Sequence, residues 1–66
     1  MMGYYEIIII YDKYCGDVIC FKYNGFVNDS NDIVTVAIEM GFIGEENRKQ
    51  VRWARSLTEY EYKHIK

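Results

Sequence analysis

Residues 4–11 are apolar or aromatic at almost every position, so the alternation expected of a half-buried strand is missing. The stretch reads YYEIIIIY and holds four consecutive isoleucines. β-Branched and aromatic residues favour strands, and a second run of this kind, VICFKY, follows at 18–23. Between the two runs, Gly16 suits the left-handed position of a short hairpin loop. The pattern therefore predicts two antiparallel strands, at about 4–11 and 18–23.

Residues 31–40 (NDIVTVAIEM) fit two patterns. A helical period places Ile33, Val34 and Ala37 on one stripe, whereas strict alternation places Val36 and Ile38 on one face of a strand. The β-branched residues favour a strand locally. The pattern of this segment alone therefore leaves helix and strand open.

Capping residues on both sides favour the helix. The preceding NDSND offers Asp29 or Ser30 as the N-cap, with Asp32 favourable in the first turn. Gly41 can end the helix in a left-handed conformation, and apolar Phe42 follows it, as is typical of helix C-termini. We therefore predict a helix over about 31–40.

The C-terminal segment 51–65 also fits two patterns. Tyr60 and Tyr62 alternate with glutamates, which is typical of a half-exposed strand, whereas Trp53, Leu57 and Tyr60 are spaced as on one face of a helix. We interpret the alternation as a strand.

The predicted fold class is α+β with the order β-β-α-β. A three-stranded antiparallel sheet, its third strand at about 52–64, carries one helix packed on one face. The chain has no proline, repeat or low-complexity run, so 1–66 is expected to form a single domain.

Both faces of the predicted hairpin are apolar, and one short helix can cover only one of them. A chain of this size buries only roughly 60% of its unfolded surface, so leaving the second face in water is costly. We therefore expect a homodimer. The candidate interface residues are Ile8, Ile10, Ile19, Phe21, Tyr60 and Tyr62. In the alternative, residues 45–65 form a helix that covers the second face within one chain.

Composition and charge narrow the function classes. Ten acidic residues against eight basic ones give a net charge of −2, whereas nucleic-acid-binding domains usually carry a basic excess. The start of the chain has no basic region or cleavage site of a signal peptide, and its apolar run is far shorter than the ~20 residues that span a bilayer. We expect a soluble, cytoplasmic protein.

The chain shows no pattern of a catalytic or metal site. There is no Ser-His-Asp order, Gly-rich phosphate loop or zinc spacing, and His64 is the only histidine. Cys15 and Cys20 are not spaced as C-x-x-C, so we expect reduced cysteines that serve packing, with an exposed thiol at Cys15 as the alternative. No enzyme activity, cofactor or metal is expected.

One basic cluster provides an alternative function. It consists of Arg48, Lys49, Arg52 and Arg55, with Trp53 inside it. Basic residues interleaved with an aromatic can bind single-stranded nucleic acid by stacking and phosphate contact. The alternative hypothesis is a small nucleic-acid-binding module built on these residues.

The hairpin YYEIIIIYDKYCGDVICFKYNGF, the capped segment NDSNDIVTVAIEMG and the final TEYEYKHI suggest a family. Their order and lengths resemble the small dimeric phage inhibitors of uracil-DNA glycosylase. The resemblance implies a dimer that mimics DNA with acidic groups and an apolar pocket on its helices. It assigns partner binding to Asp29, Asp32, Ile33, Val36, Glu39 and Met40, the acids standing for phosphates and the apolar residues lining the pocket.

Three functions are thus expected from the sequence. The first is a phage-type protein that binds and inhibits a host enzyme in the host cytoplasm, either a glycosylase or another nucleic-acid-processing or defence protein. The second is the nucleic-acid-binding module described above. The third is a structural subunit whose main property is self-association.

Overall fold

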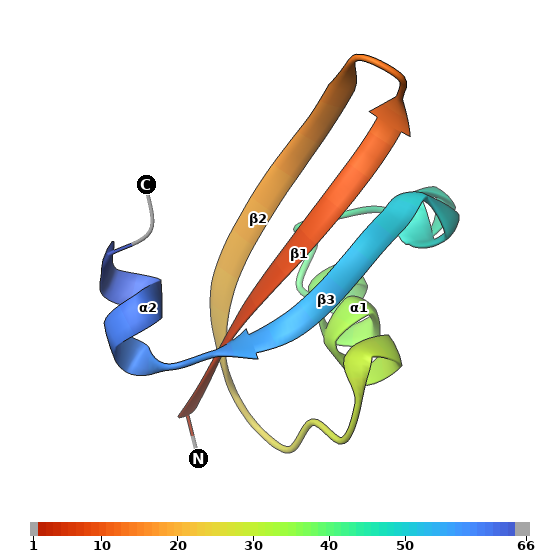
Figure 1. Ribbon diagram of the computed structural model, residues 1–66. Coiled ribbons are helices and arrows are strands. Elements are labelled where there is room, and N and C mark those ends of the chain that lie inside the picture. Colours follow the sequence, from red (N-terminus) through yellow and green to blue (C-terminus); the bar gives the residue numbers. More distant parts are fainter. Residues whose placement is uncertain (1, 65–66) are drawn as a thin grey trace.

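A computed structural model describes residues 2–64, in which three strands form one sheet and helical segments lie on both of its sides (Figure 1). The sheet order is β2-β1-β3, and both pairings are antiparallel. The predicted α+β class is confirmed. The elements are β1 (Met2–Asp12), β2 (Cys15–Asn24), α1 (Ser30–Glu39), the 3-10 helix η1 (Glu45–Gln50), β3 (Val51–Leu57) and α2 (Glu59–His64).

The hairpin of β1 and β2 is longer and its loop shorter than predicted. Only Lys13 and Tyr14 separate the strands, and the Tyr14 N–H donates to the Asp12 carboxylate at 2.8 Å. The expectation for Gly16 was wrong, since this glycine lies inside β2; of residues 2–64 only Gly41 has a positive φ. The Asp12 side chain makes the turn in its place. In Figure 1 the tip of this hairpin extends beyond the other elements.

The register of the sheet places the main core on one face, which we call the inner face. Tyr5 lies opposite Phe21, and Ile7 lies between Ile19 and Ala54 on the two neighbouring strands. Cross-strand partners point to the same side of a sheet. Of the four isoleucines, the two on this face, at 7 and 9, are fully buried.

Helix α1 covers the inner face, and its start agrees with the sequence prediction. The Asp29 carboxylate accepts a hydrogen bond from the Asp32 N–H at 3.0 Å, which is an N-cap. The Ser30 hydroxyl donates to the Ala54 carbonyl of β3 at 3.0 Å and thereby ties the helix to the sheet. The buried residues of the helix are Ile33, Val34, Val36 and Ala37.

The end of α1 was also predicted correctly. Gly41 has φ = 84° and donates its N–H to the Ile38 carbonyl at 3.1 Å, while the Phe42 N–H donates to the Ala37 carbonyl at 2.9 Å. These two bonds form a Schellman motif. The motif directs Phe42 back onto the core, where its ring stacks on Phe21 at 5.2 Å between centroids.

The prediction of a strand over 52–64 was wrong in its second half. β3 ends at Leu57, and residues 59–64 form α2. The Thr58 N–H donates to the Glu61 carboxylate at 2.8 Å, and the Glu61 N–H donates to the Thr58 hydroxyl at 3.0 Å. This capping box starts a helix, so local capping outweighs the alternation of tyrosine and glutamate.

Helix α2 lies on the second face of the sheet, which we call the outer face. The Tyr62 ring packs on Tyr4 of β1 with 4.9 Å between centroids, and Leu57 beside it is buried. The expected arrangement with one helix on one face is therefore incomplete. The alternative, a second cover from the same chain, is met in part, but by a helix of six residues rather than by 45–65.

Candidate binding face

The outer face contains three cross-strand rows, because three residues of β1 that point outward have a partner on both neighbouring strands. The middle residues of the rows are Tyr4, Glu6 and Ile8. From the α2 end upward, the rows are Lys22–Tyr4–Leu57, Cys20–Glu6–Arg55 and Val18–Ile8–Trp53. Only the first row is packed against α2, so the face changes from covered to open along the strands.

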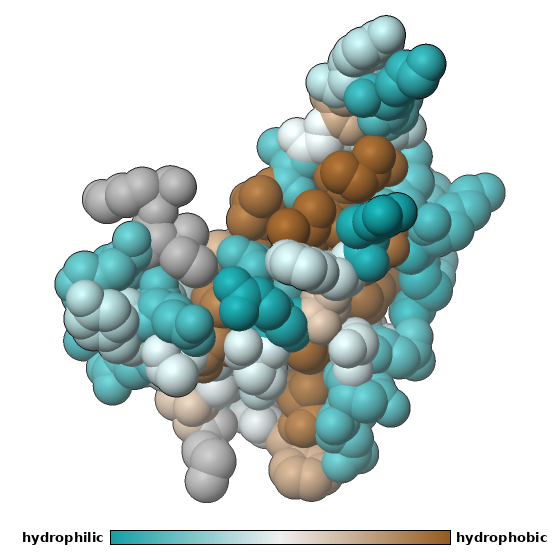
Figure 2. All heavy atoms as spheres, in the orientation of Figure 1, coloured by the Kyte–Doolittle hydropathy of each residue, from teal (hydrophilic) through white to brown (hydrophobic). Residues whose placement is uncertain are grey.

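The third row and its neighbour on β1 form an open apolar surface. We define the outer apolar patch as Ile8, Ile10, Val18 and Trp53. The exposed fraction is 46% for Ile10, 57% for Val18 and 51% for Trp53, and Ile8 is half-buried between the last two. Figure 2 shows brown side chains gathered over the β1–β2 hairpin, beside the region of α2. Contiguous exposed apolar patches mark interaction surfaces.

The middle row brings a charged pair next to the patch. Glu6 is buried, and its carboxylate accepts a hydrogen bond from Arg55 Nε at 2.8 Å. This bond to Glu6 raises the pKa of the Arg55 guanidinium. The Arg55 guanidinium carbon also lies 5.9 Å from the Trp53 ring centroid, within cation–π range. The carboxylate therefore brings no unpaired charge to the edge of the patch.

Cys20 completes this row. Burial, followed by the charge of Glu6, raises the pKa of the Cys20 thiol. Cys15 is exposed, and both cysteines are free. The exposed-thiol alternative therefore describes Cys15, whereas Cys20 is the packing cysteine.

The structure separates the residues that were predicted to form the dimer interface. Ile8 and Ile10 lie in the outer apolar patch, but the register puts Ile19 and Phe21 on the inner face, where Phe21 is almost fully buried. The prediction grouped residues from opposite faces. The two tyrosines of the set are on α2, where Tyr62 packs on Tyr4 and Tyr60 is exposed and stacks on His64.

The residues assigned by the family resemblance are also divided. Ile33 and Val36 are buried between α1 and the sheet, so they do not line an open pocket. Glu39 and Met40 are exposed, but at the opposite end of α1 from the two aspartates. Those two, Asp29 and Asp32, already accept hydrogen bonds from the backbone around the helix start.

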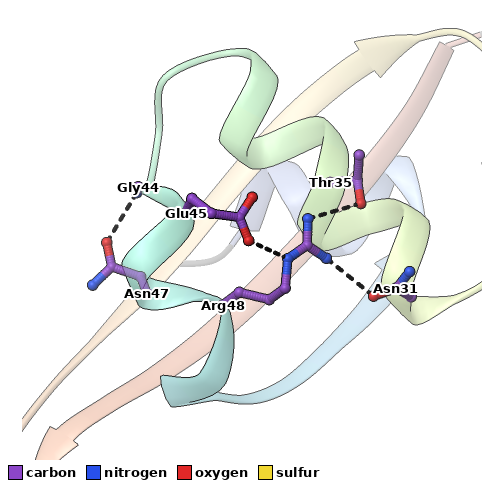
Figure 3. Close-up of polar contacts among 6 residues, drawn as sticks. All are labelled: Asn31, Thr35, Gly44, Glu45, Asn47 and Arg48. Carbon is purple, nitrogen blue, oxygen red and sulfur yellow. Dashed lines mark hydrogen bonds and ion pairs between the residues drawn. The ribbon is translucent and has the colours of Figure 1, made fainter.

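Arg48 of the basic cluster has a structural role, because it links η1 to α1. Its guanidinium donates to the Glu45 carboxylate at 2.8 Å, to the Asn31 side-chain oxygen at 3.1 Å and to the Thr35 hydroxyl at 3.2 Å. Figure 3 shows this side chain reaching from η1 to α1.

Gly44 and Asn47 fix the start of η1 through a hydrogen bond that the Gly44 N–H donates to the Asn47 side-chain oxygen at 2.9 Å.

The structure brings only part of the basic cluster together. Arg48, Arg52 and Trp53 do line one groove of about 420 Å³, between the start of α1 and β3. Lys49 lies outside this groove, and Arg55 is paired with Glu6. The groove has two cationic side chains, Arg48 and Arg52. Arg48 is paired with Glu45, whereas Arg52 forms no ion pair within residues 2–64.

No group of three or more His, Cys, Asp or Glu side chains within 2–64 is arranged to hold a metal ion. Over the same stretch, no helix has both the length and the apolar character needed to cross a membrane.

The sequence analysis missed Val18 as a site residue and assigned Trp53 to a different site. The turn alone gives no signal for Val18, because a two-residue loop that pairs Asp12 with Cys15 would set Ile8 opposite Ile19. The irregularity between Ile10 and Asp12 shifts the register by one residue, and Val18 thereby falls opposite Ile8 on the same face. Trp53 then joins them once the third strand is paired with β1.

Comparisons of the chain with models of protein families, with curated proteins and with solved structures found no match.

Proposed function

We propose that this chain is a non-catalytic binding protein that works as a homodimer, paired through the outer apolar patch. The observation that supports this is the open row Val18–Ile8–Trp53, which α2 leaves uncovered although it covers the first row of the same face. Burial of apolar surface contributes roughly 25 cal/mol per Å². Because a small domain is only marginally stable, covering such a row adds a substantial fraction of its total stability.

A second copy suits this surface because the patch carries no unpaired charge at its centre. The adjoining charges, Glu6 and Arg55, neutralise each other within one chain. Two like faces can therefore meet without burying an uncompensated charge, which would be strongly unfavourable. The row also places a small residue, Val18, and a large one, Trp53, on either side of Ile8, so two copies can interdigitate.

The dimer should be weak. A standard interface buries about 800 Å² per partner, and four partly exposed side chains supply considerably less. We expect a dissociation constant in the micromolar range, and hence a monomer at low concentration.

Sedimentation velocity from low to high micromolar concentration tests the dimer. The wild-type mass should rise from monomer to dimer, and Val18→Lys, which places a charge in the row on an exposed edge strand, should stay monomeric. Tyr14→Lys at the hairpin tip is the matched control, because Tyr14 is exposed and outside the patch, and it should dimerise like the wild type. A wild type that stays monomeric throughout, or a Val18→Lys variant that still dimerises, would contradict the proposal.

As a binding protein, the dimer would act as an inhibitor or adaptor of another protein. The resemblance to the glycosylase inhibitors makes uracil-DNA glycosylase the first target to test. If it is the target, adding the protein should stop uracil excision and the two should co-elute; unchanged excision without co-elution rules this target out. We do not extend the proposal to nucleic acid, because Arg48 and Arg55 are already in ion pairs.

A further inference from the structure

A pocket distinct from the outer apolar patch lies where β1 begins and β2 leads into α1. Its volume is about 400 Å³, within the ~300–1,000 Å³ typical of small-molecule sites. The lining residues are Met2, Gly3, Tyr5, Gly25, Phe26 and Val27. Tyr5 belongs to the inner face, so the pocket opens from the end of the core and not from the face with the patch.

Two glycines make room for the aromatic rings of this region. A Cβ on Gly3 would collide with the hydroxyl end of Tyr5, and a Cβ on Gly25 would collide with the ring of Tyr23. The Tyr5 hydroxyl therefore lies over Gly3, which is itself part of the pocket wall. This close approach fixes the polar end of Tyr5 in the pocket.

The Tyr5 hydroxyl is the polar side-chain group of this lining. Tyr5 is only 7% exposed, its ring packs on Phe21 at 5.7 Å, and its hydroxyl makes no hydrogen bond to another residue of the 2–64 stretch. No side-chain oxygen or nitrogen of that stretch is both sealed from solvent and unpartnered. The Tyr5 hydroxyl is therefore accessible to solvent, and the pocket is the route by which solvent reaches it. A buried tyrosine hydroxyl usually finds a partner.

We propose that this pocket binds a small, uncharged, mainly apolar molecule that carries one hydroxyl group, such as an aryl alcohol. The apolar body would contact Met2, Phe26 and Val27, and the ligand hydroxyl would form a hydrogen bond with the Tyr5 hydroxyl. Among residues 2–64, no charged side chain lines the pocket, which disfavours an anion or a cation. A peptide would need several polar partners for its backbone, and the lining side chains supply one.

Titration with 2-naphthol, followed by amide chemical shifts in NMR, tests this site, with 2-methylnaphthalene as the ligand of matched shape without the hydroxyl. We expect saturable shifts at Gly3, Gly25 and Phe26, and about five-fold tighter binding of the naphthol, the effect of one net hydrogen bond. Tyr5→Phe keeps the ring and should make the two affinities equal. Tyr14→Phe at the exposed hairpin tip is the control and should keep the difference.

Three results would overturn the proposal. The first is non-saturable shifts, or shifts spread over the molecule. The second is a Tyr5→Phe variant, folded by its unliganded spectrum, that still prefers the naphthol. The third is an unchanged affinity for both ligands in Phe26→Ala, since Phe26 is highly exposed at the pocket and its removal does not disturb the core.

Discussion

At the scale of residues, the middle row of the outer face puts a thiol beside an ion pair in which Glu6 is buried and Arg55 is exposed. Cys20 is partly buried and has Glu6 as its cross-strand neighbour, whereas Cys15 is exposed near the hairpin tip. Burial and the negative charge of Glu6 both disfavour the thiolate of Cys20 and raise its pKa, although Arg55 acts in the opposite direction. The two cysteines of one strand should therefore differ in reactivity.

Alkylation with iodoacetamide, mapped by mass spectrometry, should modify Cys15 several-fold faster than Cys20 at pH 8. The difference should narrow at higher pH as Cys20 ionises, and vanish in denaturant. The raised pKa of Cys20 also makes the stability of the protein depend on pH, because the folded state favours the neutral thiol. This stabilising contribution is complete below the ordinary thiol pKa and is lost as pH rises through the pKa of Cys20 in the folded protein. Equal rates in the folded protein at pH 8 would contradict this description of Cys20.

At the scale of elements, α1 is held by specific residues at both ends. Asp29 caps its start, and Gly41 allows the left-handed turn that returns Phe42 to Phe21. Apart from its two chain neighbours, no residue of the described part of the chain comes within 4 Å of a Cβ built on Gly41. The requirement for glycine there is therefore conformational rather than steric.

Gly41→Ala should lower the free energy of unfolding by about 1 kcal/mol, the cost of a left-handed conformation for an L-residue, as measured by urea denaturation. D-Alanine at the same position, introduced by chemical synthesis, should not destabilise the protein, because positive φ is favourable for a D-residue. If both alanines destabilise equally, crowding rather than backbone conformation is responsible.

At the scale of the whole molecule, two unequal covers lie on one three-stranded sheet. The longer helix, α1, seals the inner face, while α2 covers one end of the outer face through Tyr62, Tyr4 and Leu57. A helix of six residues has little stability by itself, so α2 depends on this packing. The uncovered remainder is the outer apolar patch, on which the proposed dimer rests.

Tyr62→Ala should therefore lower the free energy of unfolding by about 2 kcal/mol, because it removes an aromatic ring from Tyr4 and uncovers Leu57. Tyr60→Ala in the same helix is the matched control. Tyr60 is highly exposed, and the ring on which it stacks within residues 2–64 is that of His64, so its loss should cost less than about 0.5 kcal/mol. Equal effects of the two substitutions in urea denaturation would show that α2 does not act as a cover.

Much of the fold could be predicted from the sequence, but only part of the binding face. The hairpin and α1 were predictable because their signals are local: β-branched runs, an Asp N-cap and a Gly41 stop. α2 was not, because TEYEY satisfies both alternation and a capping box, and nothing in the pattern decides between them. Ile8 and Ile10 were predicted as interface residues and lie in the outer apolar patch, whereas Val18 was missed because the strand register depends on an irregularity between Ile10 and Asp12 that no local pattern announces.

The sequence by itself determined that this chain would have more apolar surface than one short helix can cover, since four adjacent isoleucines in a strand must divide between two faces. Only the tertiary structure decided how that surface is distributed. Pairing with β2 and β3 places Val18 and Trp53 beside Ile8, and the fold of residues 59–64 leaves that row open while it covers Tyr4. Such contacts join residues far apart in the chain, so local patterns carry little information about them.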